Sequence, residues 1–333
     1  MEIYTNIDQI DIEQWTDLLK KSDTASFFSS KECYNFYKSL SFFDEFVFAV
    51  SHNGKLQGVV VGYIQQEGGL LKRFFTRRAI IPGGVLLSPD ISKDALSLLL
   101  STMKKQLTRK AIYIEFRNYN DYNQFKVTFE KEQFKYEPHL NFHVASNDVE
   151  SALMNLNSTK RRDVKISKKE GAEIILASKE EEVLEFYEIL DDLYKTKIKT
   201  PLFSYEFFQK LFYSDFGKIV LIRYQNKIIG GSICVELENK TLYEWFVCGL
   251  DRQFKNVYPS TLATWGAIEY AASHGLARFD MMGAGKEGDG YGVRDFKSKF
   301  GGQLVEHGRF IYIADKMLFE IGKLGVKLLK GRN

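Results

Sequence analysis

The residue most suited to chemistry in this 333-residue sequence is a lysine inside a short aromatic and glycine-rich stretch. Phe296 and Phe300 flank Lys297 at anchoring positions, and Gly301-Gly302 follow, where the backbone can approach another segment closely. These neighbours distinguish Lys297 from an ordinary surface lysine. A fixed ammonium near an ester carbonyl would stabilise the oxyanion of a tetrahedral intermediate.

A second chemical feature is a basic stretch, residues 160–169, in which six of ten positions are Lys or Arg. On a helix, Arg161, Lys165 and the neighbours Lys168 and Lys169 share one side. A clustered basic face is the footprint expected for phosphates, from tRNA or from a nucleotide-sugar precursor. A solvated connector helix would give the same pattern, and both interpretations stay open.

Metal, disulfide and membrane-spanning classes are not expected. His139 and His143 are four residues apart, but the segment around them reads as a strand, so no metal site is predicted. The three cysteines form no CxxC pair. No apolar run approaches the roughly 18 residues of a membrane span, and the N-terminus lacks the apolar region of a signal peptide. We therefore expect a soluble, cytoplasmic protein.

The elements that position these residues include two segments of similar sequence. They are VFAVSHNGKLQGVVVGYI (47–64) and IVLIRYQNKIIGGSICVE (219–236). Each is a strand, a polar turn and a second strand, and Gly58 aligns with Gly230. Each hairpin is followed by a helix and a strand; these are expected at 92–107 and 111–117, and at 260–274 and 277–282. The pattern predicts a mixed α/β chain of two tandem lobes, each a mixed sheet flanked by helices.

Three further helices are expected, at 151–170, 180–197 and 316–330. The first is the basic connector. The last is amphipathic, with an apolar stripe that includes Met317, Ile321 and Leu324, and with lysines largely elsewhere. It is interpreted either as a helix docked on a lobe or as a basic contact with a membrane surface.

The order of elements in each lobe resembles the GNAT acyltransferase layout. In that fold, acyl-CoA pyrophosphate is gripped by a glycine-rich loop at a helix N-terminus, where free backbone N–H groups bind anions. The corresponding stretch here, 252–260, contains no glycine, and Pro259 has no N–H to donate. We therefore expect a poor acyl-CoA site. The separate glycine-rich loop Gly283–Gly292 lacks phosphate-loop spacing and is interpreted as a mobile, substrate-covering loop or as an ordinary surface loop.

Two stretches, Leu156–Ile174 and Asp280–Gly302, together resemble the FemABX family. Members of that family transfer residues from aminoacyl-tRNA to an amine on a peptidoglycan precursor. They contain two GNAT-like lobes, and their C-terminal segment returns to the first lobe. The resemblance implies a first lobe at 1–150 that is completed by 308–333, and a second lobe at 151–307.

The resemblance also implies roles for individual residues. It places Lys297 at the reaction centre as the catalytic group. The residues implied to bind substrate are Phe296, Lys38, Arg161, Lys165, Tyr243, Trp245, Tyr291 and Arg294. The sequence departs from the family where an Asp-Pro is usual, because Arg117-Asn118 stands there.

The expected function is aminoacyl transfer from aminoacyl-tRNA to a small-molecule or lipid-linked cell-wall precursor. No tightly bound cofactor or metal is expected; tRNA is the expected donor partner, and membrane contact would go through the C-terminal helix. Two alternatives stay open: an N-acyltransferase of the same fold that uses acyl-CoA or another acyl donor, and a non-catalytic binding module.

Overall fold

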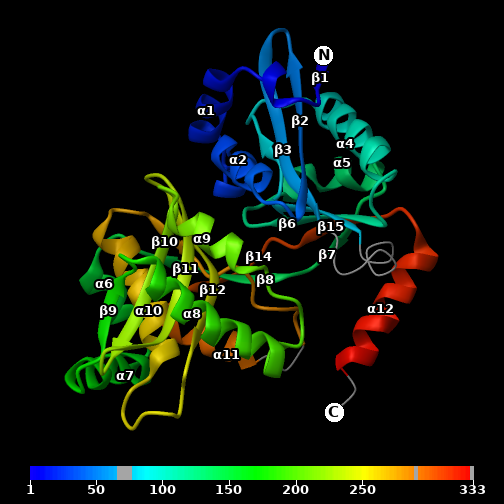
Figure 1. Ribbon diagram of the computed structural model, residues 1–333. Coiled ribbons are helices and arrows are strands. Elements are labelled where there is room, and N and C mark those ends of the chain that lie inside the picture. Colours follow the sequence, from blue (N-terminus) through cyan, green and yellow to red (C-terminus); the bar gives the residue numbers. More distant parts are fainter. Residues whose placement is uncertain (66–76, 289–291, 331–333) are drawn as a thin grey trace. The chain divides into compact units, whose positions relative to one another are not determined.

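The computed structural model describes residues 1–65, 77–288 and 292–330 (Figure 1). The chain forms two compact units, one of Met1–His139 with Glu306–Asn333 and the other of Leu140–Val305. Each unit is built on one mixed β-sheet with helices packed against it. The predicted mixed α/β class with two tandem lobes is confirmed. None of the helices in the described part of the chain is long and apolar enough to cross a membrane.

The first unit has one sheet whose strands come from both ends of the chain. Its helices are α1 (Ile12–Lys21), α2 (Lys31–Ser39), α4 (Lys93–Leu107), α5 (Lys126–Lys131) and α12 (Lys316–Lys330). A short strand, β5 (Leu86–Leu87), pairs beside the main path with β3. Across the sheet the strands are β1 (Glu2–Tyr4), β2 (Phe43–His52), β3 (Lys55–Gln65), β4 (Arg78–Gly83), β6 (Tyr113–Asn118), β15 (Arg309–Ile313) and β7 (Lys135–Glu137).

The second unit has a sheet of the same plan. Its helices are α6 (Val149–Asn155), α7 (Ser158–Lys169), α8 (Glu180–Leu193), α9 (Tyr205–Phe212), α10 (Pro259–Ser273) and α11 (Gly292–Lys297). Across the sheet the strands are β9 (Glu173–Leu176), β10 (Gly217–Tyr224), β11 (Lys227–Leu237), β12 (Thr241–Gly249), β13 (Arg278–Asp280), β8 (Leu140–Ala145) and β14 (Gln303–Glu306).

The duplication extends to an irregularity in the two hairpins. Gly58 pairs with Val50 in the first, and Gly230 pairs with Ile222 in the second. In both hairpins the register shifts directly after this pair, so a β-bulge lies at the same place. The two hairpins also occupy matching positions in their sheets, and in each sheet the next two strands run parallel with a helix between them. The sequence alignment of Gly58 with Gly230 therefore corresponds to a structural equivalence.

In each sheet, the strand next to one edge follows a strand of the other sheet along the chain. β8 follows β7 directly along the chain, yet it pairs with β13 in the second sheet. β15 follows β14, yet it pairs between β6 and β7 in the first sheet. The second unit consequently starts at Leu140, whereas the sequence-based division kept residues through 150 in the first lobe. The boundary differs because a strand that reads as the end of one lobe completes the other sheet.

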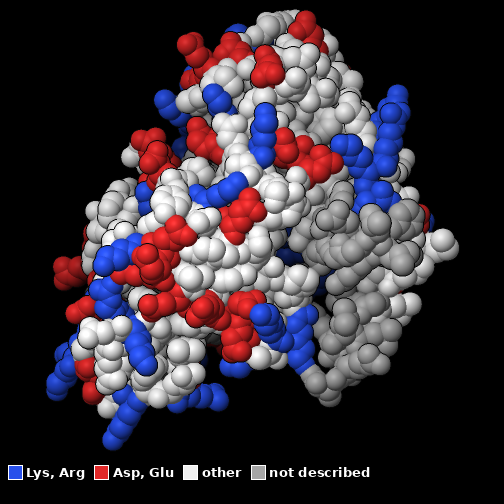
Figure 2. All heavy atoms as spheres, in the orientation of Figure 1, with Lys and Arg blue, Asp and Glu red and all other residues white. Residues whose placement is uncertain are grey.

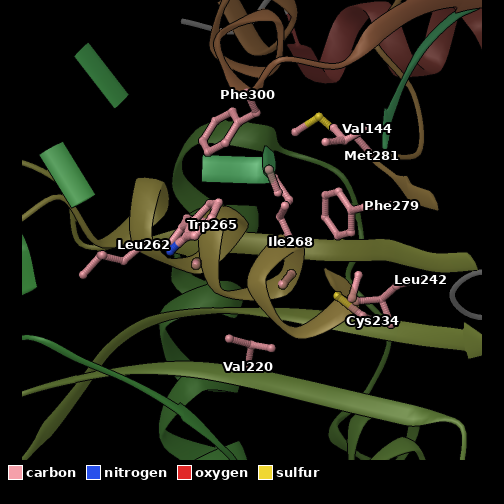
Figure 3. Packing of buried hydrophobic residues seen from close by; sticks show 14 of the residues in the cluster. Val144, Val220, Cys234, Leu242, Leu262, Trp265, Ile268, Phe279, Met281 and Phe300 are labelled. Atoms are coloured by element: carbon pink, nitrogen blue, oxygen red, sulfur yellow. The ribbon is translucent and has the colours of Figure 1, made fainter. Parts of the chain in front are cut away.

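The core of the second unit lies around α10. This helix is apolar on nearly every side, as expected of a helix that is buried rather than amphipathic. Figure 3 shows Trp265 and Ile268 of α10 packed among residues from the strands, together with Phe300 from the predicted reaction stretch. The stretch that contains Lys297 is thus anchored in the main core of this unit.

The predicted helix at 151–170 is instead two helices, α6 and α7. The break falls at Leu156 and Asn157, and the Asn157 side chain accepts a hydrogen bond from the Lys160 backbone N–H at 2.8 Å. An Asn at this position is a strong N-cap that stops one helix and starts the next. The sequence carried this signal in Asn157, which directly precedes the second helix.

Candidate active site

The sheet of the second unit opens where its two parallel strands separate. β12 and β13 pair only through Thr241–Tyr243 and Arg278–Asp280, and β12 then continues to Gly249 paired with β11 but not with β13. The register between β11 and β12 also shifts here, at Trp245. In the first unit the corresponding strands, β4 and β6, stay paired along Arg78–Gly83. The opening therefore distinguishes the second unit from the first.

Lys297, the last residue of α11, reaches the backbone that follows β13. Its side chain is almost fully buried, and the residue is 7% exposed. The Nζ atom donates hydrogen bonds to the carbonyl oxygens of Met281 and Gly283, the second at 2.8 Å. A lysine ammonium carries three protons. The described residues offer no hydrogen-bond acceptor for the third, so the group is fixed in place with one donor left over.

Two buried carboxylates lie close enough to Lys297 to act on its charge. Asp280 ends β13; its Oδ1 accepts hydrogen bonds from Asn141 Nδ2 at 2.7 Å and from the Met282 backbone N–H at 2.8 Å. Its Oδ2 is 3.1 Å from His143 Nε2. Glu244 lies on β12, just past the last parallel pair. The site therefore combines one ammonium with two carboxylates drawn from separate strands.

Burial and neighbouring charges shift the pKa values of Lys297, Glu244 and Asp280 in opposite directions. Burial lowers the pKa of Lys297, and the negative charges of Glu244 and Asp280 oppose this only in part. Burial also raises the pKa of Glu244, against the lowering effect of Lys297. For Asp280, burial would raise the pKa, but His143 and neighbouring donors hold it below its ordinary value. The cluster is thus electrostatically coupled around the lysine.

The two sequence stretches that carried the family resemblance form one structural piece. Lys160 of α7 is buried, donates to Thr261 Oγ1 at 2.6 Å and lies over the Phe296 ring at 4.2 Å. Gly301 has a φ of +77°, and a Cβ there would collide with the Asn155 carbonyl. The lysine stretch is therefore held by the α6–α7 junction, with Phe296 and Lys160 as the contact.

The N-terminus of α10 is occupied by side chains of the chain itself. Asp251 Oδ1 accepts a hydrogen bond from the Ser260 backbone N–H at 3.1 Å, and Ser167 Oγ accepts one from the Tyr258 N–H at 3.0 Å. A Cβ on Gly249 would lie 2.5 Å from the Ser260 nitrogen, so β12 closes against this helix end. GNAT enzymes bind a pyrophosphate at the corresponding helix N-terminus. Here Asp251, Ser167 and the close approach of β12 occupy that position.

The match to known families comes from both sequence and fold. The model of the FemAB family matches residues 222–325, which include β12, α10 and Lys297. A crystal structure of FemX superposes with a TM-score of 0.73 at 15% identity, covering 96% of this chain and 99% of that chain. The FemABX resemblance is confirmed. The family match supports the prediction of an acyltransferase, and the shared fold shows the architecture.

Two other solved structures share the fold. L-PGS from Bacillus licheniformis has a TM-score of 0.56 at 12% identity, covering 94% of this chain and 96% of that chain. A tandem GNAT protein from the clavulanic acid biosynthesis pathway has a TM-score of 0.54 at 10% identity, covering 94% and 99%. No curated protein matches the FemABX-like chain in sequence. The neighbours thus confirm the tandem GNAT-like architecture.

The residues predicted for the site fall into different environments. Phe296 and Arg294 lie with Lys297 in the second unit, where Arg294 Nε donates to the Ala284 carbonyl at 2.9 Å. Tyr243 is fully buried, so its side chain presents no surface to a substrate. Trp245 is half-buried and packs edge-on against Phe207 at 4.9 Å.

The remaining predicted residues make none of the contacts described for Lys297. Arg161 donates to the Met154 carbonyl and so ties α7 to α6, while Lys165 is exposed. Lys38 is exposed on α2 of the first unit. Tyr291 lies outside the described residues.

The first part of the glycine-rich loop is fixed rather than free. Ala284 N–H donates to the Leu140 carbonyl at 2.7 Å, and Leu140 N–H donates to the Gly285 carbonyl at 2.9 Å. Arg294 holds the same segment through its carbonyls. The interpretation of a mobile covering loop does not fit residues 283–286, whereas residues 289–291 lie outside the described residues.

Sequence reasoning missed the two carboxylates. Glu244 is a single acidic residue inside an otherwise apolar and aromatic strand, between Tyr243 and Trp245. A charge within a buried strand is rare unless it is paired, so its position was an available signal. His143 was considered only as a metal ligand. In the described ranges, no group of three or more His, Cys, Asp or Glu is arranged to hold a metal ion.

Proposed function

We propose that the chain transfers an aminoacyl group from aminoacyl-tRNA to the amine of a cell-wall precursor, in the cytoplasm. The observation that carries this proposal is the Lys297 ammonium, which two backbone carbonyls fix at the strand opening with one proton left to donate. A donor held in advance stabilises charge that develops in the transition state without reorganisation. The proposal also rests on what the FemABX resemblance implies for donor and acceptor.

The proposed reaction needs no protein nucleophile. The acceptor amine attacks the ester carbonyl carbon of the donor, and a C–N bond forms as the carbonyl oxygen becomes an oxyanion beside Lys297 Nζ. The C–O bond to the tRNA ribose then breaks, and the proton lost by the amine ends on the ribose oxygen. Lys297 thus acts as the oxyanion donor, and the acceptor itself supplies the nucleophile.

The alternative donor, acyl-CoA, receives less support. The α10 N-terminus already donates a hydrogen bond to Asp251, a carboxylate that would repel a pyrophosphate. In the first unit, Ser92 caps α4 by accepting from the Ala95 N–H at 3.1 Å, and no glycine precedes it between residues 85 and 92. Both positions at which a GNAT lobe binds a pyrophosphate are therefore poorly suited to it.

We expect label to move from a charged tRNA pool, and not from acetyl-CoA, to an amine-bearing cell-wall precursor pool. Calorimetry should show acetyl-CoA binding weaker than micromolar, because the helix N-terminus is filled by Asp251. Micromolar binding of acetyl-CoA that survives moderate salt would favour the acyl-CoA alternative. Binding of the precursor without transfer from either donor would favour the non-catalytic module.

The basic helix α7 supplies the proposed contact with phosphates. Its lysines differ in structure: Lys160 is buried, Lys168 pairs with Glu269 at 3.0 Å, and Lys165 and Lys169 are exposed. Figure 2 shows Lys and Arg side chains interspersed with Asp and Glu over the face drawn. A phosphate contact would therefore be local, and it would rest on Lys165 and Lys169.

Replacing Lys165 and Lys169 together with alanine should weaken tRNA binding and flatten its dependence on salt. Each phosphate contact that is lost lowers the slope of log K against log salt by about one. The matched control is Lys168→Ala, since Glu269 already neutralises that lysine. Filter binding over a series of salt concentrations gives the slopes. Equal slopes for the double variant and the wild type would return α7 to the role of a solvated connector.

Contact with a membrane surface is proposed through α12. Phe319 packs on Tyr113 with ring centroids 5.2 Å apart, whereas Met317, Ile321 and Leu324 are exposed. These three recur at helical spacing and form an apolar stripe that the described structure leaves uncovered. Such a stripe beside lysines suits the surface of an anionic bilayer, where a lipid-linked precursor would be met.

A further inference from the structure

We infer that Asn141 of β8 is a positioning residue, whose side-chain amide shapes the backbone that holds the Lys297 ammonium. It acts through this backbone and not on the substrate. The catalytic meaning of the inference rests on the proposed function, but the positioning itself can be measured without a transfer assay. Asn141 lies outside the residues that the FemAB family model matches and outside the two stretches that carried the resemblance.

The backbone after β13 forms a bulge opposite Asn141. The segments Met281–Ala284 and Leu140–Phe142 run antiparallel and are joined by backbone hydrogen bonds at both ends. One bond joins the first N–H of the former segment to the last carbonyl of the latter, at 3.0 Å, and the other joins the opposite ends, at 2.7 Å. Between these bonds Met282 and Gly283 face the single residue Asn141. Two residues against one make a β-bulge, which redirects the backbone groups around it.

Side chains accept hydrogen bonds from both N–H groups of this bulge. The Met282 N–H donates to Asp280 Oδ1 at 2.8 Å, and the Gly283 N–H donates to Asn141 Oδ1 at 2.9 Å. Asn141 Nδ2 donates to the same Asp280 oxygen at 2.7 Å. Because an N–H needs an acceptor and a carboxylate needs a donor, these partners fix the orientation of the Asn141 amide. Asn141 therefore links the two side-chain contacts that hold the bulge.

The bulge brings together the two carbonyl oxygens to which Lys297 donates. These belong to Met281 and Gly283, the residues on either side of Met282. In a regular strand, carbonyls two residues apart are about 7 Å from each other, too far for one ammonium to bond to both. Here φ is +51° at Met282 and +100° at Gly283, so the backbone is not extended. Convergence of the carbonyls on Lys297 thus depends on the bulge.

This backbone conformation needs support from its surroundings. A positive φ is unfavourable for Met282, as for most residues with a side chain, and persists where neighbouring groups hold it. The preceding residue, Met281, is fixed in the core of the unit, where its side chain is fully buried (Figure 3). Past it, the contacts of Asp280 and Asn141 hold the two bulge N–H groups. Asn141 is itself 4% exposed, as expected of a residue that supports the site from within.

The first test measures the ammonium directly, by NMR of nitrogen-15-labelled protein, with the Lys297 signal identified by its loss in Lys297→Arg. Asn141→Leu keeps the approximate size of the side chain and removes both its acceptor and its donor, without changing any charge. The Lys297 signal, resolved in the wild type, should move to the position of the exposed lysines or be lost through exchange with water. The Gly283 amide should exchange about tenfold faster, the effect of one lost hydrogen bond.

The second test separates positioning from a loss of structure. Asn141→Leu should lower the single-turnover rate of transfer by up to about a hundredfold, the cost of misplacing a reacting group by about 1 Å. Substrate affinity should change little. In a Lys297→Ala background the same substitution should lower the rate no further, because it acts through Lys297. A general structural defect would lower the rate by the same factor in both backgrounds.

Ser146→Ala is the matched control. Ser146 is fully buried just past the other end of β8, and its Oγ donates to the Leu276 carbonyl, shortly before β13, at 2.7 Å. The variant therefore removes a buried hydrogen bond between the same two parts of the chain, away from the bulge. The Lys297 signal and the rate should stay as in the wild type.

Asn141→Ser covers a folding failure of Asn141→Leu. It places no apolar group beside Asp280, but its hydroxyl is one bond shorter than the amide and cannot hold both Asp280 and the Gly283 N–H. The same changes are expected in smaller measure. If both Asn141 variants fail to fold while Ser146→Ala folds, Asn141 is a structural requirement of the sheet and the inference is wrong.

The outcomes separate the inference from the proposed function. A displaced Lys297 signal in a protein that transfers no aminoacyl group would support the positioning role and remove the function. Transfer by the wild type, with the Lys297 signal and the rate unchanged in folded Asn141→Leu, would overturn the inference and leave the function standing. Equal losses of rate with and without Lys297 would also overturn it.

Discussion

Lys297→Ala is expected to lower the single-turnover rate of aminoacyl transfer by about a hundredfold to a thousandfold, the usual cost of a lost oxyanion donor. Substrate affinity should change far less, because the ammonium acts on charge that develops only in the transition state. The loss follows from the fixed position of Nζ, which two carbonyls hold with one proton still available. Lys297→Arg should restore only part of the rate, since the planar guanidinium places its charge differently.

Stability must be measured alongside the rate. Lys297 is buried and bonded to Met281 and Gly283, so Lys297→Ala should also lower the stability of the fold. Its removal takes this donor away from the Met281 and Gly283 carbonyls. Such losses cost about 1–3 kcal/mol for each unsatisfied group. A melting curve for each variant therefore separates slow chemistry from partial unfolding.

Lys299→Ala is the control for both measurements. Lys299 belongs to the same stretch but is exposed, so its replacement should change neither the rate nor the melting temperature by much. Equal and small effects on the rate at Lys297 and Lys299, in folded proteins, would contradict the catalytic assignment. The non-catalytic binding module would then become the leading interpretation.

Truncation after residue 305 is expected to prevent the first unit from folding. The truncation removes β15, which lies between β6 and the edge strand β7 of that sheet (Figure 1). It also removes Phe310, which is fully buried and stacks on Phe129 with ring centroids 4.0 Å apart. Phe310→Ala alone should cost about 3–5 kcal/mol of the free energy of unfolding. Loss of the whole strand should cost more, since β6 then becomes an open edge.

Charge adds to the attachment of β15. Arg309 Nη1 is 2.6 Å from Glu115 Oε1 on β6, and Arg117 is 3.1 Å from the other carboxylate oxygen. Although burial would raise the pKa of Glu115, these two arginines lower it to about 2. The β15 strand is therefore held by an ion pair as well as by its hydrogen bonds and the Phe310 stack.

The control for the truncation ends the chain after Asp315, which keeps β15 and removes only α12. That variant should melt close to the wild-type temperature, apart from the loss of the Phe319 contact with Tyr113. Hydrogen exchange of the β6 amides reports on the first unit separately from the second. Protected β6 amides in the variant truncated after residue 305 would show that β15 is dispensable, contrary to the prediction.

The sequence by itself determined the duplicated plan and the main elements. Both hairpins alternate apolar residues at period two and carry glycine at matching positions, which predicted that Gly58 and Gly230 are equivalent. Such patterns are encoded within a few neighbouring residues. It also indicated Lys297, since its flanking aromatics and glycines lie within one short stretch. These features depend on near neighbours along the chain.

Tertiary structure decided the features that depend on distant pairing. The pairing of β8 with the second sheet was not visible in local patterns, because this strand could complete either sheet, whereas the return of residues 308–333 to the first lobe was implied by the family resemblance. Glu244 joined the site only because the strands part beside it and α11 brings Lys297 to the opening. The burial of Lys160 over Phe296 likewise turned one of the basic residues into a core contact. The burial and the electrostatic environment of a residue depend on which strands and helices pack around it. The sequence encodes that packing only indirectly.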